Sequence, residues 1–374
     1  MSDSHVEDRF LGIGIAGYGT EFKGIGGRIK ERPEDFVVAE VLAEEARRLI
    51  RKRGEGYPLY VMSKWNTDIL SAKKTVEGAV KSKVNILGLK DKRAVTHQFV
   101  SSRSRTSLRD NWSGGGVKVV HRKDTSRPLT RRELFGNAFD IRISDCLSDN
   151  EALVLTKHAL ENSRIPNFFG MQRFGSVHPN HIVGKYIVKR EFAKASALVS
   201  DTSDQPLKAL RQIPLKVRRL YVSAYQSYLF NRCLSRLLSE GSLPQNTENE
   251  VLLEFDRNLP RVGSSFVTHG TNSKDKCFVQ MCPVPGYSFR SRENLYWKAM
   301  EEVLKEEGVS PKDFFVKELQ EVSAEGGLRP ASMIGWLKGW RLEDSTRVRF
   351  ILYKGEFATI LLRELIKDGP TNQI

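Results

Sequence analysis

One acidic residue in this sequence stands among cations at a position suited to chemistry. The segment 88–98 has the sequence GLKDKRAVTHQ, in which Asp91 is flanked by Lys90, Lys92 and Arg93. Because nearby positive charges favour the ionised form of an acid, we expect a carboxylate at neutral pH. Held in a turn after a short apolar strand, such a group could act on an electron-poor centre. The pattern alone leaves open an Asp that is structural or only solvated.

Aromatic residues recur beside basic or amide side chains in three further segments. They are GNAFDIRI (136–143), NFFGMQRFG (167–175) and KGEFAT (354–359). A phenylalanine ring offers a face on which a nucleobase can stack, and stacking stabilises a complex by about 1–3 kcal/mol. Asn137 could bond the edge of a base or order a loop. Any one of these rings, taken singly, could instead belong to the core.

The charge of the chain points to a polyanionic partner. Lys and Arg number 60 against 45 Asp and Glu, a formal net charge of +15, and an excess of this size favours nucleic acid or an anionic surface. Between residues 102 and 132 there are nine Lys and Arg against two Asp. The cations expected to contact a phosphate backbone are Arg103, Arg105, Arg122, Lys123, Arg131, Arg132 and Arg173. A basic loop that is merely solvated is the alternative.

Other chemistry finds little support. Gly12, Gly14 and Gly17 have the spacing of a dinucleotide-binding loop, but that motif requires a strand before it and a helix after it. The preceding residues are too polar for a buried strand, and a glycine-rich loop follows. The sequence contains no Walker-type phosphate loop and no serine-nucleophile motif. We therefore expect no nucleotide cofactor.

We also expect a cytoplasmic protein without membrane contact. No stretch reaches the roughly 20 apolar residues of a membrane-spanning helix, and the acidic, polar N-terminus differs from a signal peptide. The cysteines are Cys146, Cys233, Cys277 and Cys282. Because their spacing is not that of a zinc site, we expect reduced structural thiols and no metal.

In the first third of the chain, we expect short strands and one helix to position the candidate residues. Strands are expected at 35–41, 58–65, 84–89, 97–102 and 139–143, where β-branched and aromatic residues concentrate. Thr67 or Asp68 should cap a helix. The apolar face of this helix should consist of Ile69, Ala72, Val76 and Val80.

The middle of the chain differs from both ends. A long helix is expected around 219–240 and an acidic helix around 293–307, closed by Gly308. The last fifty residues resemble the first part, with a strand at 346–353 and a helix beginning within 356–365. This pattern predicts an α+β fold in which residues 1–165 and 325–374 form one domain and residues 166–324 form a second, inserted domain.

Six ordered segments together resemble the TruD family of tRNA pseudouridine synthases. They are GGRIKERPEDFVVAE (26–40), GLKDKRAVTHQ (88–98), GNAFDIRI (136–143), IPNFFGMQRFGS (165–176), SAYQSYLFN (223–231) and GEFATILLREL (355–365). The resemblance spans most of the chain. It implies a pseudouridine-synthase-like catalytic domain with a mixed, largely antiparallel sheet, interrupted by an inserted α/β TRUD domain.

The resemblance also implies the reaction and its residues. Uridine of tRNA, usually uridine 13, would be isomerised to pseudouridine without a cofactor. Apart from the resemblance, we expect the enzyme to be a monomer. Asp91 would be catalytic, as nucleophile or as base toward the ribose. Lys30 would pair with Asp91, Phe139 would stack on the flipped uracil, and Asn137 and Phe357 would line the site.

Two other functions would account for part of this sequence pattern. A non-catalytic RNA-binding or RNA-folding factor would account for the charge and the aromatic residues, but it gives no role to a lone Asp among cations. An RNA methyltransferase would need a loop for a nucleotide cofactor, and the sequence offers no credible one.

Overall fold

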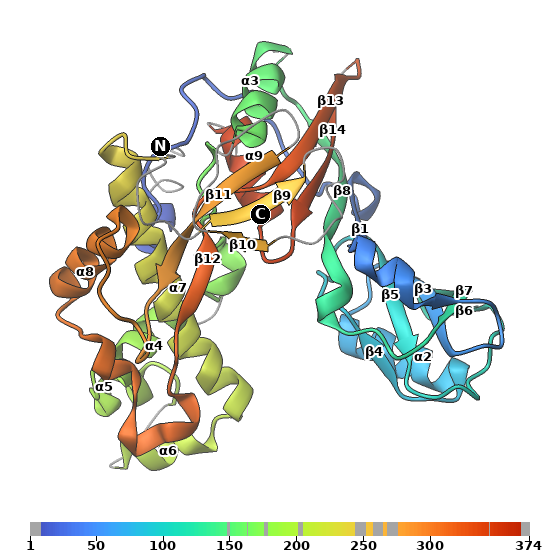
Figure 1. Ribbon diagram of the computed structural model, residues 1–374, viewed down its shortest axis with the longest axis horizontal. Coiled ribbons are helices and arrows are strands. Elements are labelled where there is room, and N and C mark those ends of the chain that lie inside the picture. Colours follow the sequence, from blue (N-terminus) through green and yellow to red (C-terminus); the bar gives the residue numbers. More distant parts are fainter. Residues whose placement is uncertain are drawn as a thin grey trace.

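The computed structural model describes residues 9–147, 150–162, 164–175, 179–200, 205–243, 252–256, 265–267, 276–343 and 345–367. Helices gather at one end of the molecule, and a long curled sheet extends to the other (Figure 1). Strands from both ends of the chain take part in this sheet. None of the helices within the described ranges combines the length and the apolar character needed to cross a membrane.

The main sheet has ten strands and is mixed but largely antiparallel. Their bounds are β1 (Phe36–Leu42), β2 (Ile50–Arg51), β3 (Tyr57–Lys64), β4 (Val84–Ile86), β5 (Val95–Ser102), β6 (Trp112–Gly114), β7 (Val117–Thr125), β8 (Leu134–Ser144), β13 (Gly335–Arg341) and β14 (Ser345–Tyr353). The order is β13-β14-β8-β1-β5-β3-β7-β2, with β4 on β5 and β6 on β7. Only β1 and β5 pair in parallel among these strands. The predicted fold class is confirmed.

Alternation along the central strands separates two cores. Phe139 and Ile141 of β8 lie on one face with Phe350 of β14, inside the largest group of buried apolar side chains. Val41 and Phe135 contribute to a smaller cluster on the other face. The register between β1 and β8 shifts at Val41. Because successive side chains of a strand point to opposite faces, such a shift changes which residues reach each core.

The helix after β3 confirms the expected cap. Helix α2 (Ile69–Val80) begins after Asp68, whose side chain accepts hydrogen bonds from the amides of Leu70 and Ser71. Its buried residues are Ala72, Val76 and Val80, while Ile69 packs at the edge of the same cluster. A capping carboxylate satisfies amides that the helix itself leaves unpaired. The cap therefore fixes where this helix starts against β7.

The middle of the chain is largely helical. Its helices are α4 (Asn180–Val188), α5 (Phe192–Ala197), α6 (Pro206–Gln212), α7 (Leu215–Ser239) and α8 (Leu295–Glu307). Gly308 closes α8 with a φ of +62°, as the sequence predicted. Helix α7 runs through the centre of this group (Figure 1). Its buried side includes Tyr225 and Leu229, and the long helix expected around 219–240 is confirmed.

A second, antiparallel sheet lies between the helices and the main sheet. It has the order β10-β9-β11-β12. The bounds are β9 (Leu252–Asp256), β10 (Ser265–Val267), β11 (Lys276–Val284) and β12 (Gly327–Pro330). Val279 and Met281 of β11 pack into the small cluster that contains Val41 and Phe135. The second sheet is thereby attached to one face of the main sheet.

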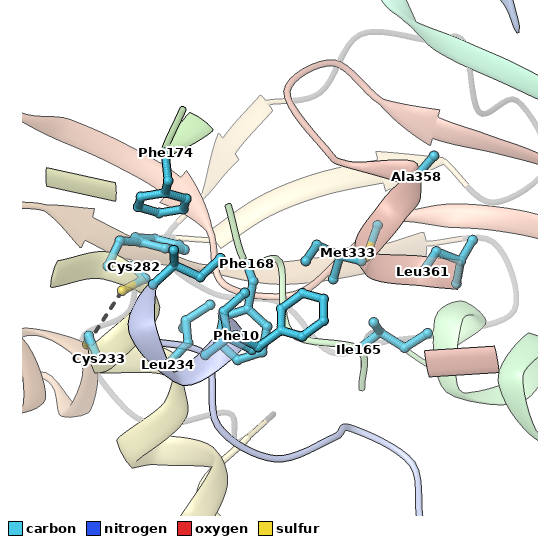
Figure 2. Close-up of a cluster of buried hydrophobic side chains, with 14 of the residues drawn as sticks. Phe10, Ile165, Phe168, Phe174, Cys233, Leu234, Cys282, Met333, Ala358 and Leu361 are labelled. Carbon is cyan, nitrogen blue, oxygen red and sulfur yellow. Dashed lines mark hydrogen bonds between the residues drawn. The ribbon is translucent and has the colours of Figure 1, made fainter. Parts of the chain in front are cut away.

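Distant segments share the large core. Figure 2 shows residues of this cluster from many elements, namely Phe10, Ile165, Phe168, Phe174, Cys233, Leu234, Cys282, Met333, Ala358 and Leu361. Two further helices close the fold, α3 (Asn150–Glu161) and α9 (Ala358–Ile366). Cys146, Cys233 and Cys282 are free and buried, in agreement with the sequence prediction. The side chain of Cys277 lies outside the described residues.

The glycine spacing near the N-terminus does not belong to a dinucleotide site. A short helical turn ends at Gly12, and no helix follows Gly17 before residue 33. Gly14 has a φ of +79° and packs against Tyr228 and Arg232 of α7. These glycines therefore serve a close approach between the N-terminal segment and α7.

Candidate active site

Asp91 lies in a loop that several hydrogen bonds fix to the main sheet. The loop spans residues 87–94 between β4 and β5. The buried Lys64 of β3 donates to the main-chain oxygen of Asp91 at 2.6 Å, and Gln98 of β5 donates to the oxygen of Gly88 at 2.8 Å. The side chain of Asp91 is 54% exposed. The carboxylate is therefore presented to solvent from an anchored backbone.

Lys30 is the charge partner of Asp91. Its Nζ lies 3.3 Å from Oδ2 of Asp91, and its own side chain is only 13% exposed. The ammonium also lies 4.3 Å from the centre of the Phe36 ring, where the face of an aromatic ring attracts a cation. Lys30 has a positive φ of 61°, a conformation that non-glycine residues seldom adopt. The backbone is thus held in an uncommon state to aim this side chain.

Phe139 lies in the sheet beside Phe36. The two ring centres are 6.2 Å apart in an edge-to-face arrangement. On β14, Phe350 is directly opposite Phe139, and these rings stack at 4.9 Å. Phe139 is 9% exposed. Since Phe350 covers one of its faces, only the remaining part of the ring is left for a ligand.

Asn137 presents a buried acceptor without a partner. The residue lies opposite Glu40 of β1 and Leu352 of β14. Within the described part of the chain, no donor reaches its Oδ1, although this atom is shielded from solvent. Buried polar atoms are nearly always hydrogen-bonded in folded proteins. An amide oxygen left without a donor is therefore suited to receive one from a bound molecule.

Two charged contacts bring the Asp91 loop over the face of the sheet that carries Asn137 and Phe139. Lys90 donates to Oε1 of Glu40 at 2.8 Å, and Glu40 is opposite Asn137. At the other end, Lys30 joins Asp91 to Phe36, the edge-to-face neighbour of Phe139. Four of the five residues expected at the site, Lys30, Asp91, Asn137 and Phe139, thus share one region of the fold.

Known proteins resemble this chain in sequence and in fold. A model of the tRNA pseudouridine synthase D (TruD) family matches residues 12–206 and 196–365. The chain belongs to this family.

Relatives match over nearly the whole length. A protein of Thermococcus onnurineus is 30% identical, covering 94% of this chain and 97% of its own; one of Pyrococcus furiosus is 30% identical, covering 95% and 99%. Both bear the name "Probable tRNA pseudouridine synthase D". A crystal structure of a Methanosarcina mazei protein with the tRNA pseudouridine synthase D name superposes with a TM-score of 0.73. It covers 98% of this chain and 99% of its own at 24% identity, and it supports the fold.

Membership in the TruD family confirms the expected enzyme class, a tRNA pseudouridine synthase, which is an isomerase. The class decides against the non-catalytic RNA-binding factor and against the methyltransferase. The target uridine and the roles of individual residues remain predictions.

Residues that the sequence analysis missed hold the candidate site of this TruD-family member together. Glu40 is buried and also accepts the amide of Phe99 at 2.8 Å. Burial lowers the pKa of the Lys64 ammonium, and the negative charge of Asp91 opposes this shift. Glu40 could have been found, because it occupies an inward position of the alternation Phe36, Val38, Glu40. A charged residue in such a position needs a partner.

Phe357 lies with a different group of side chains. It precedes α9 and contacts Phe169 edge to face at 6.1 Å. The guanidinium of Arg329 lies 4.1 Å from the ring centre of Phe169 and 5.8 Å from that of Phe357. Within the part of the chain that the structure describes, Phe357 makes no ring contact with Phe139 and no contact with Asp91. Nothing in the sequence pointed to Arg329 as a member of this group.

The predicted RNA-contacting cations fall into two groups. Four lie on the lobe formed by β3 to β7 and are exposed, namely Arg103, Arg105, Arg122 and Lys123. Arg103 donates to Asn85 at 2.7 Å, and Arg105 lies over the ring of Tyr57 at 5.2 Å. By contrast, Arg109 pairs with the buried Asp124 at 2.7 Å. The positive charge of Arg109 is therefore used inside the fold.

The second group lies where the main sheet approaches the helices. Arg131 and Arg132 are exposed in the turn before β8, and Arg173 is half-buried. Arg173 donates to the hydroxyl of Ser227 at 3.2 Å and lies 5.9 Å from the ring centre of Phe169. Burial lowers the pKa of Arg173, and the positive charge of Arg131 adds to this shift. Like charges are thus kept close together here.

Proposed function

We propose that this tRNA pseudouridine synthase isomerises uridine 13 of tRNA and that Asp91 is its essential catalytic residue. In the reaction the N1–C1′ bond breaks, the uracil turns, and a C5–C1′ bond forms. The C5 proton is lost and N1 gains one, so the product is an isomer and no electrons are exchanged. The proposal therefore includes neither a metal nor a nucleotide cofactor.

The observation that carries the proposal is the Lys30–Asp91 pair beside Phe139 and Asn137. Asp91 would act on the ribose, as nucleophile at C1′ or as base at C2′. Lys30 would hold the carboxylate in place, because its Nζ lies 3.3 Å from Oδ2 of Asp91. The exposure of Asp91 leaves room for a sugar to approach it.

Recognition of the uracil would fall to the neighbouring sheet residues. Phe139 would stack on the base with the part of its ring that Phe350 leaves uncovered. The unpartnered Oδ1 of Asn137 would accept the imide N–H of uracil. Phe357 would complete the aromatic lining. The base can reach this position only after it leaves its stack, so base flipping is part of the proposal.

The predicted RNA-contacting cations would hold the rest of the tRNA. Arg103, Arg105, Arg122 and Lys123 would contact phosphates from one lobe, and Arg131, Arg132 and Arg173 from the other side. Proteins recognise folded RNA mainly by its shape and its phosphates. Binding should therefore weaken as salt rises. The logarithm of the binding constant should fall with the logarithm of the salt concentration, with a slope of about −0.7 for each phosphate contact on single-stranded parts.

We also propose the division of the chain into a catalytic domain (1–165 and 325–374) and an inserted domain (166–324). Strand β12 pairs with β11, so the two proposed domains share a sheet near residue 325. A cytoplasmic monomer completes the proposal.

The deciding experiment uses Asp91→Asn, which keeps the size of the side chain and removes its charge. Purified variant and wild type are incubated with tRNA transcripts in which uridine 13 is present or replaced by cytidine. We expect near-total loss of pseudouridine in the variant, with binding of the RNA largely retained. Wild-type product from Asp91→Asn would reject the catalytic role. Product from the cytidine-13 transcript would reject the target.

A further inference from the structure

A basic cleft lies beside the candidate active site. Its volume is about 810 Å³, within the range of about 300–1,000 Å³ typical for small-molecule sites. The lining comes from the 3-10 helix Glu44–Leu49, the start of β8, β12 and the end of β14. Neither Asp91 nor Phe139 lines it. We call this cavity the basic cleft; the lining residues used below are Arg132, Leu134, Phe169, Arg329 and Lys354.

Cations without a carboxylate partner lie in the basic cleft and next to it. Lys354 lines the cleft, while Arg131 and Arg173 lie beside the lining residues Arg132 and Phe169. For Lys354, Arg131 and Arg173, the described part of the chain contains no acid within ion-pair distance, whereas Arg127 is paired with Glu133 at 2.6 Å. Burial lowers the pKa of Lys354, and the charge of Arg131 lowers it further, while the charges of the lining residues Glu133 and Glu45 oppose this shift. Positive charges held together in a partly dehydrated cleft repel each other. An anion placed among them would relieve that repulsion.

A rigid aromatic and guanidinium surface forms one wall of the cleft. Arg329 stacks on Phe169 at 4.1 Å. Its guanidinium donates to the main-chain oxygens of Asn167 at 3.1 Å and of Gly355 at 2.9 Å, and to Oδ1 of Asn167 at 2.5 Å. Because these bonds fix the guanidinium plane, the wall does not have to be ordered when a ligand binds. Flat, cationic surfaces of this kind suit nucleobases.

The cleft adjoins the loop that carries Asp91. A Cβ placed on Gly88 would lie 3.7 Å from Cδ2 of Leu134, a lining residue, and 3.0 Å from Oε1 of Glu40. Gly88 is three residues before Asp91. One RNA strand could therefore meet the carboxylate and the cleft with consecutive nucleotides.

We propose that the basic cleft binds a nucleotide that neighbours the target uridine, with its phosphate between Lys354, Arg131 and Arg132 and its base against Phe169 and Arg329. This inference rests on the proposed function, since it assumes that the target reaches Asp91. The proposed occupant is a nucleotide within an RNA strand. Binding of a free nucleotide instead is the alternative that the second test detects.

The first test compares Lys354→Met with Lys338→Met. Both remove one positive charge, but Lys338 is an exposed residue of β13 and does not line the cleft. Binding of a tRNA transcript is measured by fluorescence anisotropy over a range of KCl concentrations. Lys354→Met should weaken binding and reduce the magnitude of the salt slope by about 0.7, while Lys338→Met should match wild type. Thermal melting checks that both variants are folded.

A kinetic measurement separates this proposal from the catalytic one. At enzyme concentrations that saturate the RNA, Lys354→Met should convert uridine at the wild-type single-turnover rate, whereas Asp91→Asn should not. If Lys354→Met behaves like Lys338→Met in binding, the cleft proposal is overturned and the role of Asp91 is unaffected. The cleft proposal is also overturned if Lys354→Met lowers the single-turnover rate at saturating enzyme and leaves binding unchanged.

A second test locates the nucleotide without any variant. The tRNA carries 4-thiouridine on either side of the target, and the irradiated complex is digested and analysed by mass spectrometry. We expect cross-links to peptides that contain Phe169 or Lys354. Cross-links confined to other surfaces would contradict the proposal. So would uridine monophosphate that binds the free enzyme at micromolar concentration and displaces the RNA, because the cleft would then be a small-molecule site.

Discussion

Lys30 and Asp91 form an ion pair with unequal environments: the ammonium is largely buried against Phe36, and the carboxylate faces solvent. Holding the cation inside the fold and the anion at its surface leaves the anion free to meet a substrate. The cation restrains the position of the carboxylate without covering it.

Replacing Lys30 by Met should therefore lower the rate more than it lowers binding. We expect the single-turnover rate at saturating enzyme to fall by about 100-fold, the loss that a catalytic group displaced by about 1 Å can cause. Lys30→Arg, which keeps the charge, should recover part of the rate. A wild-type rate for Lys30→Met would show that the pair has no part in the reaction.

Asn137→Leu should separate stability from activity. The variant removes a buried oxygen without a described donor, and an unsatisfied buried polar atom costs about 1–3 kcal/mol. The free energy of unfolding in urea should thus be unchanged or higher, while product formation falls because the uracil loses its acceptor. A variant that is clearly less stable and still active would assign Asn137 to the fold.

The contact between Lys90 and Glu40 should behave as a buried ion pair. Their side chains are 7% and 0% exposed, and removal of one partner from such a pair costs about 3–5 kcal/mol. Lys90→Met alone should be strongly destabilised in urea. The double variant Lys90→Met/Glu40→Gln should recover much of the loss, since no unpaired charge is left. Additive losses would rule out this coupling.

Glu356 should make stability depend on pH. Burial raises the pKa of this carboxyl from 4.5 to about 8, while the amides of Ile334 and Tyr353 and the charge of Arg329 oppose the shift. Between these two pH values the folded state retains a proton that the unfolded state has lost, so this group lowers stability as pH rises from 4.5 to 8.

The comparison of wild type with Glu356→Gln tests this effect. The variant should gain stability relative to wild type between pH 5 and pH 8 in urea unfolding experiments, because the amide has no proton to lose. A stability difference that stays constant over this interval would contradict the raised pKa.

Local signals in the sequence were sufficient for many elements. Asp68 caps α2 as predicted, because the carboxylate and the amides that it bonds are only a few residues apart. Gly308 likewise ends α8 through a backbone conformation that glycine adopts without strain. The ordered motifs gave the family, and with it the enzyme class.

The partners that residues find far along the chain were beyond the sequence. Glu40 stood in a strand pattern with no sign that Lys90, fifty residues later, would reach it. Arg329 carried no local feature that would place it on Phe169. Such contacts form only when strands and loops far apart in the chain are folded together.

The sequence by itself determined the kind of chemistry, since a carboxylate among cations, stacking rings and an excess of positive charge are properties of residue types and their order. Only the tertiary structure decided the arrangement: Lys30 paired with Asp91, Asn137 without a donor, and Phe357 grouped with Arg329. The physical reason is that residue types and spacing act through short-range interactions along the chain. The environment of each charged or polar side chain is set by segments that meet it from elsewhere in the fold.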